Sequence, residues 1–155
     1  MHIWGAAALT GLSFTVASEA IAQQKPPYWA SITAAKARMR TGPGRNFPAN
    51  WLYQRAGLPV RVIETYPNWR KVEDPDGTKG WMQANLLTDE RTAMVRGGIQ
   101  SLRVSPDPAA RVNWRAAPGV VGKLSDCANG WCKLDVNGRS GFVESRYLWG
   151  VGPGE

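Results

Sequence analysis

Two stretches of the chain carry the same landmark residues in the same order. The landmarks of the first stretch are Arg40, Pro43, Gly57, Val62, Trp69, Lys71, Val72, Gly80-Trp81 and Leu87, and those of the second are Arg103, Pro106, Gly119, Leu124, Trp131, Lys133, Leu134, Gly141-Phe142 and Leu148. The two sets lie about 60 residues apart, a spacing longer than most solenoid or propeller repeats. We therefore expect two copies of one small module.

Short strands are predicted between these landmarks, because the segments are rich in Val, Ile, Trp and Tyr and are bounded by turn residues. The predicted strands are Trp51–Gln54, Leu58–Thr65, Trp69–Glu73 and Gly80–Gln83, followed by Val112–Arg115, Val120–Cys127, Trp131–Val136 and Gly141–Glu144. No stretch keeps a helical period, and the 17 Gly and 11 Pro interrupt the chain too often for long helices. This pattern predicts an all-β chain of small barrels or sandwiches.

The first 22 residues resemble an export signal. Residues 3–16 are mostly apolar, and Ala20-Ile21-Ala22 is a small-x-small cleavage site. The apolar run is too short to span a bilayer, so we expect no retained membrane span, with an uncleaved anchor or a truncated start as the alternative. We predict a signal peptide at 1–22, a leader at 23–32, and modules at 33–89 and 92–151.

The charge of the chain favours anionic partners. Cutting after Ala22 removes Glu19 and no Lys or Arg, so the formal net charge rises from +7 to +8. In a periplasmic or secreted protein, this charge suits an anionic polymer of the envelope and gives no reason to expect nucleic acid. The alternative is that the charge serves solubility, and no run of five cations marks a concentrated patch.

The residue content argues against catalysis. The only histidine, His2, leaves with the predicted signal peptide, so Ser-His-Asp and Cys-His mechanisms have no base. Zinc sites have too few ligands, and the acidic residues sit mainly at turns. We therefore expect no enzyme activity, no metal and no cofactor.

One hairpin predicts a disulfide. Asn129-Gly130 is typical of a type I′ turn, which pairs Ala128 with Trp131 and places Cys127 opposite Cys132. Cα atoms in such a pair are about 4.5 Å apart, within the range of a disulfide. Export supplies an oxidising compartment, so we expect Cys127 and Cys132 to be bonded, with two free thiols as the alternative.

The same pairing predicts one cross-strand ion pair in each copy. It places Asp126 opposite Lys133 in the second copy and Glu64 opposite Lys71 in the first. Cross-strand pairs of opposite charge contribute roughly 0.2 to 1 kcal/mol, so these would support the strand pairing without defining a function.

Two tryptophans are predicted to face outward. Side chains alternate along a strand, so Trp69 and Lys71 point to the face opposite Val72, and Trp131 and Lys133 to the face opposite Leu134. If Val72 and Leu134 face the core, each Trp forms an exposed ledge beside a Lys, suited to stacking against a peptide or sugar. The alternative is burial of both Trp by a second layer or by the other module.

The order of short motifs resembles the bacterial SH3 (SH3b) domain family over about residues 33–149. The motifs are Met39-Arg40-Thr41-Gly42-Pro43-Gly44, Gly57-Leu58-Pro59-Val60-Arg61-Val62, Asn68-Trp69-Arg70-Lys71-Val72 and Gly80-Trp81-Met82, repeated more loosely as Leu102-Arg103-Val104-Ser105-Pro106, Gly119, Gly130-Trp131-Cys132-Lys133-Leu134 and Gly141-Phe142-Val143. The resemblance implies two tandem, strongly bent SH3-like barrels with short 3-10 turns, found in exported proteins as binding modules. It also implies that Tyr147 occupies the position of the groove tyrosine, where the first copy has Leu86.

The leading hypothesis is a non-catalytic tandem SH3b protein of the cell envelope. It would hold an envelope peptide, peptidoglycan or a partner protein through Trp69, Lys71, Trp131, Lys133 and Tyr147. One alternative is a scaffold or accessory subunit whose modules pack on each other or on a partner enzyme. A wall hydrolase is a further alternative, although hydrolases of this kind place a Cys, His or metal-binding domain beside the module.

Overall fold

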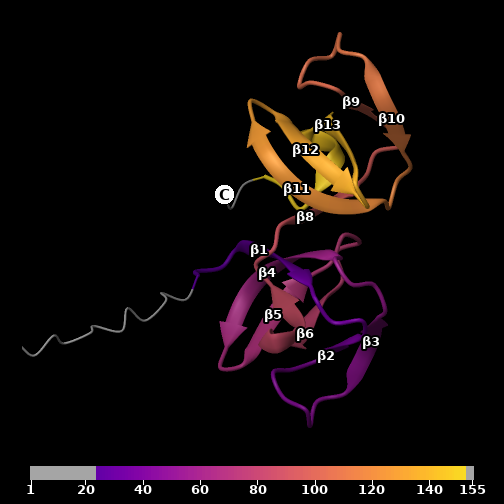
Figure 1. The fold of residues 1–155 in the computed structure, drawn as a ribbon. Coiled ribbons are helices and arrows are strands. Elements are labelled where there is room, and N and C mark those ends of the chain that lie inside the picture. Colours follow the sequence, from indigo (N-terminus) through magenta and orange to yellow (C-terminus); the bar gives the residue numbers. More distant parts are fainter. Residues whose placement is uncertain (1–23, 153–155) are drawn as a thin grey trace, which may run out of the picture.

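The computed structural model describes residues 24–152, which form two all-β modules joined end to end (Figure 1). The first module consists of β1 (Tyr28–Ile32), β2 (Ala37–Arg40), β3 (Ala49–Tyr53), β4 (Pro59–Tyr66), β5 (Trp69–Glu73), β6 (Lys79–Gln83), the 3-10 turn η1 (Ala84–Leu86) and β7 (Leu87–Thr88). The second consists of β8 (Thr92–Val95), β9 (Gln100–Arg103), β10 (Val112–Ala116), β11 (Val121–Ala128), β12 (Trp131–Val136), β13 (Arg139–Glu144), the 3-10 turn η2 (Ser145–Tyr147) and β14 (Leu148–Trp149). The predicted signal peptide, residues 1–22, lies outside the described residues.

The two modules share one topology. The strand order is β3-β2-β6-β5-β4-β1-β7 in the first sheet and β10-β9-β13-β12-β11-β8-β14 in the second, and all described pairs are antiparallel. Each strand of the second module therefore takes the place of the strand seven positions earlier. This arrangement confirms the prediction of an all-β chain with tandem SH3-like barrels and short 3-10 turns.

The first module begins earlier than the predicted boundary at residue 33. Residues Tyr28–Ile32, which the sequence analysis assigned to a leader, form β1 and pair with both β4 and β7. Ala30 and Ile32 are buried in the core of the module. The apolar residues Tyr28, Ala30 and Ile32 recur at every second position, which is the period of a half-buried strand, but the preceding prolines obscured it.

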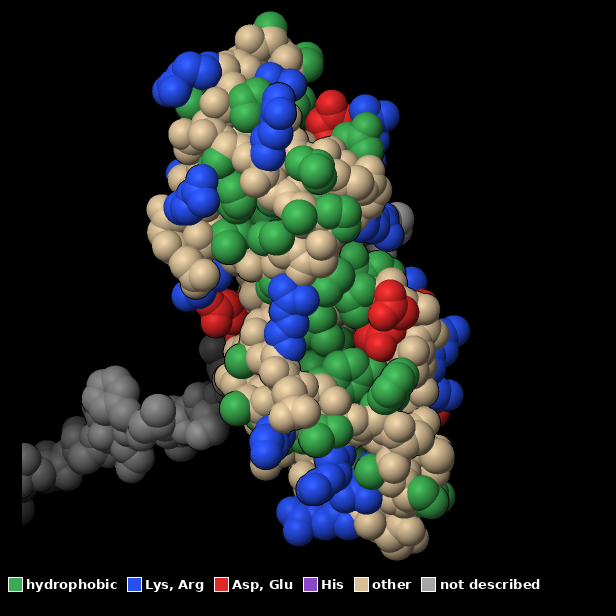
Figure 2. Space-filling model, turned by 90° about the vertical axis from the view of Figure 1, so that its right-hand side faces the viewer, with side chains coloured by type: hydrophobic (Ala, Val, Ile, Leu, Met, Phe, Trp, Pro, Cys, Tyr) green, Lys and Arg blue, Asp and Glu red, His purple; other side chains and the backbone are tan. Residues whose placement is uncertain are grey.

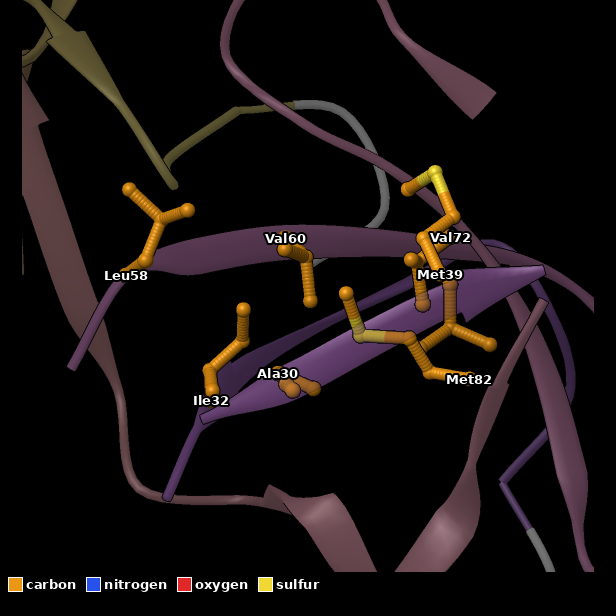
Figure 3. Packing of buried hydrophobic residues seen from close by; sticks show 9 residues of the cluster. Ala30, Ile32, Met39, Leu58, Val60, Val72 and Met82 are labelled. Atoms are coloured by element: carbon orange, nitrogen blue, oxygen red, sulfur yellow. The ribbon is translucent and has the colours of Figure 1, made fainter. Parts of the chain in front are cut away.

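Each module has a separate hydrophobic core. Figure 3 shows Ala30, Ile32, Met39, Leu58, Val60, Val72 and Met82 converging inside the first module. The second core consists of Ala93, Val95, Leu102, Ala116, Cys132, Leu134, Val143 and Leu148. Val72 and Leu134 both face inward, which confirms the direction of alternation predicted for β5 and β12.

The hairpin between β11 and β12 has the predicted turn. Asn129 and Gly130 have φ angles of 52° and 81°, and Ala128 pairs with Trp131. Cys127 and Cys132 form a disulfide with a Cα–Cα distance of 4.0 Å. The structure therefore confirms the predicted pairing of the two cysteines.

Only one of the two predicted ion pairs forms across its hairpin. In the first module Glu64 lies opposite Lys71, and a carboxylate oxygen is 3.6 Å from Nζ. In the second module Ser125, and not Asp126, lies opposite Lys133. The prediction for Asp126 was wrong because β11 contains a β-bulge between Ser125 and Ala128, and the extra residue shifts the register.

The two modules pack directly on each other across the three-residue connection 89–91. The indole N–H of Trp149 donates to the carbonyl of Pro59 at 3.2 Å, and its ring packs edge-on against Trp29 with centroids 5.0 Å apart. The Thr92 hydroxyl donates to the carbonyl of Gly57 at 2.7 Å. Arg55 donates to the carbonyl of Gly119 at 2.6 Å, so contacts link both sides of the boundary.

Candidate functional site

A pocket of about 170 Å³ lies on the first module around Trp69. Its lining comes from the approach to β2, from β2, β3, β5 and β6, and from η1: Lys36, Arg38, Arg40, Leu52, Trp69, Gln83 and Leu86. Trp69 is only 8% exposed. The prediction of an exposed ledge was therefore wrong for Trp69, because side chains from neighbouring elements surround the indole and leave it as part of a pocket wall.

A second pocket of about 170 Å³ lies on the second module around Trp131. It is lined by Ile99, Gln100, Ser101, Arg103, Trp131, Val143, Glu144 and Tyr147. Trp131 is half-buried, while its neighbour Cys132 points to the opposite face and is fully buried. The structure thus brings together Trp131 and Tyr147, the aromatic pair that the resemblance placed in one groove.

The two pockets occupy equivalent positions in the duplicated fold. The corresponding lining residues are Lys36 and Ile99, Arg38 and Ser101, Arg40 and Arg103, Trp69 and Trp131, Gln83 and Glu144, and Leu86 and Tyr147. Both pockets lie within a module, so neither Trp is buried at the boundary between the modules. A Trp and an Arg are thus retained in both pockets, while the other polar positions differ.

The retained arginines hold the loop that follows β2 or β9. Arg40 donates to the carbonyls of Arg45 at 3.3 Å and Phe47 at 2.9 Å. Arg103 donates to the carbonyl of Ala110 at 2.7 Å. Because these contacts satisfy backbone acceptors in each loop, both arginines have a structural role besides lining a pocket.

The two predicted lysines do not line either pocket. Lys71 lies beside Glu64, as described above, and Lys133 places Nζ 6.0 Å from the centre of the Phe142 ring. Both lie on the same strand face as the neighbouring Trp but two residues farther from the turn. The structure therefore separates the predicted Trp-Lys ledges into a pocket and an adjacent surface.

The polar residues of the second pocket are held by an arginine outside it. Arg146 forms an ion pair with Glu144, and its guanidinium carbon lies 4.7 Å from the centre of the Tyr147 ring. An arginine stacked in this way contributes about 0.5 to 1 kcal/mol at an exposed site. These contacts fix both Glu144 and Tyr147 at the pocket.

The sequence analysis missed the basic side of the first pocket. Lys36, Arg38 and Arg40 recur at every second residue, so the sequence contained a signal for three cations on one strand face. The search for runs of consecutive cations overlooked this pattern, since alternation in a strand gathers charges that are not adjacent in sequence.

A larger and more polar cleft of about 710 Å³ lies between the modules. Its lining includes Ser31, Arg55, Glu90, Thr92, Lys123 and Asp135. Nζ of Lys123 lies 3.0 Å from a carboxylate oxygen of Glu90. The hydrogen bond that Lys123 donates to Glu90 raises the pKa of Lys123. The cleft therefore combines charges of both signs, several of which already have partners within the protein.

No group of three or more His, Cys, Asp or Glu side chains suited to a metal occurs within residues 24–152. In the same part of the chain, no helix is both long enough and apolar enough to cross a membrane. The arrangement that the described residues do offer is a pair of small aromatic pockets with polar rims.

Comparison with known proteins identifies the module. The family model for the bacterial SH3 domain matches residues 33–89 and 97–150. The chain belongs to the bacterial SH3 domain family. Residues 33–89 include every residue that lines the Trp69 pocket, and residues 97–150 include every residue that lines the Trp131 pocket. The pockets described above are therefore features of two SH3 domains of this family.

The similar proteins are longer than this chain. A Bacillus subtilis (strain 168) protein named as an N-acetylmuramoyl-L-alanine amidase, YrvJ, is 26% identical over 144 residues, which cover 79% of this chain and 27% of that protein. An NlpC/P60 family protein from Bacillus cereus is similar over 78% of this chain and 55% of its own, with 14% identity and a TM-score of 0.36. NlpC1 from Trichomonas vaginalis is similar over 89% of this chain and 50% of its own, with 10% identity and a TM-score of 0.36. The chain thus spans about a quarter of YrvJ and about half of these solved structures.

Proposed function

We propose that this chain is a non-catalytic binding protein of the cell envelope, periplasmic or secreted, which holds a wall peptide, peptidoglycan or a partner protein in its two tryptophan pockets. One observation carries this proposal: the same pocket recurs at the equivalent position of both SH3 domains. The indole at the wall of each pocket gives both modules an apolar surface that a ligand can contact.

The composition of the pockets suits a short segment of peptide. An indole offers a large flat surface for stacking, and the rim residues offer donors and acceptors that can fix the orientation of a ligand. Each cavity of about 170 Å³ has room for one or two side chains and not for a large cofactor. The name of YrvJ concerns N-acetylmuramoyl-L-alanine, so peptidoglycan is the first ligand to test.

Direct packing between the modules bears on the alternative of a scaffold or accessory subunit. Trp149 and Thr92 make contacts across the boundary, whereas Trp69 and Trp131 lie in pockets away from it. The modules can therefore pack on each other while both pockets stay free for a ligand. In this arrangement the chain could also position a partner enzyme that acts on the same wall material.

The experiment is a pull-down of the purified protein with isolated peptidoglycan and, separately, with envelope proteins, at low and moderate salt. Binding through the pockets should persist at ordinary ionic strength, whereas attraction by net charge alone should disappear. Trp131→Ala should lower the affinity for the captured ligand by about tenfold, since buried aromatic anchors dominate such interfaces. Trp131 is half-buried, so this variant should keep the fold, which a thermal melt can verify.

The matched control is Trp51→Ala. Trp51 is 53% exposed on β3 and lines neither pocket, so this variant removes an indole from the surface without touching the proposed site. Equal losses in Trp131→Ala and Trp51→Ala would contradict binding through the pockets. Retention of full affinity by Trp131→Ala and by Tyr147→Phe would move the binding site away from the second module.

A further inference from the structure

The Trp69 pocket is lined by cations without an accompanying acid. Lys36, Arg38 and Arg40 contribute three positive charges, and none of its lining residues is Asp or Glu. Arg45 adds a fourth cation at the edge, since the side-chain oxygen of Gln83 can face it and accept from Nε at 3.2 Å and from Nη2 at 3.3 Å. Positive charges brought this close repel one another, and a bound anion would relieve the repulsion.

The equivalent pocket of the second module carries no net charge. Ile99 and Ser101 replace Lys36 and Arg38, and Glu144 replaces Gln83, which leaves Arg103 as the one cation in the lining. Ile99 is 69% exposed, so its position is open to solvent and a lysine there would meet no packing constraint. The difference in charge therefore follows from the choice of residue at the rim and not from a difference in the backbone.

The cations specific to the first pocket, Lys36 and Arg38, also have no ion-pair partner among residues 24–152. Within residues 24–152, ion pairs join Lys71 to Glu64, Lys123 to Glu90 and Arg146 to Glu144, but no carboxylate lies within ion-pair distance of Lys36 or Arg38. Figure 2 shows Lys and Arg side chains gathered at the lower end of the molecule, in the first module, where the view shows few acidic side chains.

The apolar part of the pocket limits what the anion can be attached to. Trp69, Leu52 and Leu86 line the cavity beside the cations, so a ligand needs an uncharged portion that contacts them. An arginine and a lysine side by side suit a carboxylate, which accepts two parallel hydrogen bonds from a guanidinium. A peptide that ends in a free carboxylate has both parts, whereas a free phosphate ion has only the charge.

We propose that the two SH3 domains differ in ligand charge, and that the Trp69 pocket binds the free carboxylate of a short peptide through Lys36 and Arg38. Trp69, Leu52 and Leu86 contact the aliphatic portion of that peptide. This inference deepens the proposed function and rests on it, because it concerns the ligand of one of the same two pockets. It assigns the neutral Trp131 pocket to a group without a net negative charge.

The test is a titration of the full two-module chain, labelled with ¹⁵N, with N-acetyl-Ala-Ala and with the same peptide amidated at its C-terminus. The indole N–H signals of Trp69 and Trp131 report on each pocket and are assigned with Trp69→Phe and Trp131→Phe. The free acid should bind the Trp69 pocket at least about fivefold more tightly than the amide, since hydrogen bonds to charged groups contribute more than neutral ones. At the Trp131 pocket the two peptides should bind alike.

Exchange of rim residues between the copies supplies the decisive variants. Lys36→Ile with Arg38→Ser gives the first pocket the residues of the second and should remove the preference for the acid. The control Arg111→Ser with Arg115→Ser removes the same charge from exposed positions outside both pockets and should keep the preference. The reciprocal change, Ile99→Lys with Ser101→Arg and Glu144→Gln, should create the preference in the second pocket.

Each contrary result has a distinct meaning. Equal affinity of acid and amide at the Trp69 pocket would overturn this inference while leaving peptide binding by the two domains intact. An equal loss in the Arg111 and Arg115 control would also overturn it, because net charge would then explain the preference. Inorganic phosphate that shifts the Trp69 signal as strongly as the acid peptide would overturn the assignment to a peptide carboxylate. If neither peptide moved either indole signal, this inference would fall together with the proposal that the pockets bind peptides.

Discussion

The two SH3 domains have the same strand order, but side chains shield the outer face of each sheet, the face that points away from the core, to different extents. Trp69 and Trp81 of the first module are each 8% exposed, whereas the equivalent Trp131 and Phe142 are half-buried. Tyr66 packs edge-on against Trp81 with ring centroids 6.5 Å apart. The position equivalent to Tyr66 is Ala128, which has no ring to offer, so the face around Phe142 stays more open.

The hairpin tips differ in the same way. In the first module the tip is held by the aromatic contact of Tyr66, and in the second by the disulfide between Cys127 and Cys132. Positions that face a core are limited by volume, so both copies keep apolar residues there. Positions that face solvent carry no such limit, and they are where the stabilising contacts and the charge of the pockets have diverged.

The largest effect expected from this comparison is the loss in the free energy of unfolding when an aromatic side chain is removed from the outer face. Trp81→Ala should lower the free energy of unfolding by about 3 to 5 kcal/mol, as for other buried aromatics. Phe142→Ala should cost clearly less, about 1 to 2 kcal/mol, because a half-buried ring loses less apolar contact. Urea unfolding followed by circular dichroism measures both, and equal losses would show that the two faces are packed alike.

The next largest loss of stability is expected from removing a hydrogen bond of the first module that has no equivalent among the described residues of the second. The hydroxyl of Tyr53 donates to Asp74 at 2.7 Å, and burial, reinforced by this bond, raises the pKa of Tyr53 well above its ordinary value. Tyr53→Phe leaves one oxygen of the buried Asp74 without this donor, so it should cost about 1 to 3 kcal/mol at pH 7. Ala116 stands at the equivalent position of the second module, which therefore has no such pair.

The contribution of Tyr53 should depend on pH in one direction. Unfolded tyrosine ionises near pH 10, while the folded protein retains the proton, so this stability is fully present below about pH 10 and is lost as the pH rises further. The difference between wild type and Tyr53→Phe should then narrow in unfolding experiments from pH 9 to 11. Tyr66→Phe is the control, since Tyr66 is 54% exposed and should keep the wild-type profile. A constant difference across this range would contradict the raised pKa.

Reduction of the disulfide should have a moderate effect. Cys127 and Cys132 close a loop of only a few residues, so their bond should contribute about 2 kcal/mol or less. A reductant should lower the melting temperature by less than about 10 °C without unfolding either module. Non-reduced protein should show no free thiol, and labelling of both cysteines in exported protein would contradict the bonded state.

The smallest effect distinguishes the two hairpins by their ion pairs. A double-mutant cycle on Glu64 and Lys71 should give a coupling of about 0.5 kcal/mol or less, since both groups are partly exposed. The corresponding cycle on Asp126 and Lys133 should give none, because the bulge moves Asp126 out of register. Equal couplings in the two cycles would show that the bulge does not separate the second pair.

The sequence alone predicted those elements whose geometry depends on residues close together in the chain. Spacing of landmarks predicted two modules, and Asn129-Gly130 predicted the turn that pairs Cys127 with Cys132. Residue composition and turn residues predicted eight strands between Trp51 and Glu144, but β2, β8 and β9 were not among them. Each of these predictions depends on residues close together in the chain, where turn geometry and side-chain alternation leave few choices. The strand β1 was missed for a local reason as well, since Pro26-Pro27 made an extended leader the simpler interpretation.

Tertiary structure decided which surfaces became pockets. Alternation fixed the face on which Trp69 lies, but its burial depends on side chains from β2, β3, β6 and η1, which the fold brings around it. The bulge that displaces Asp126 is likewise a property of two paired strands and not of one. The sequence therefore determined the duplicated β architecture, the disulfide and the net charge, because these follow from local geometry and composition. The pockets and the difference in charge between them depend on contacts among residues far apart in the chain, and only the folded chain brings those residues together.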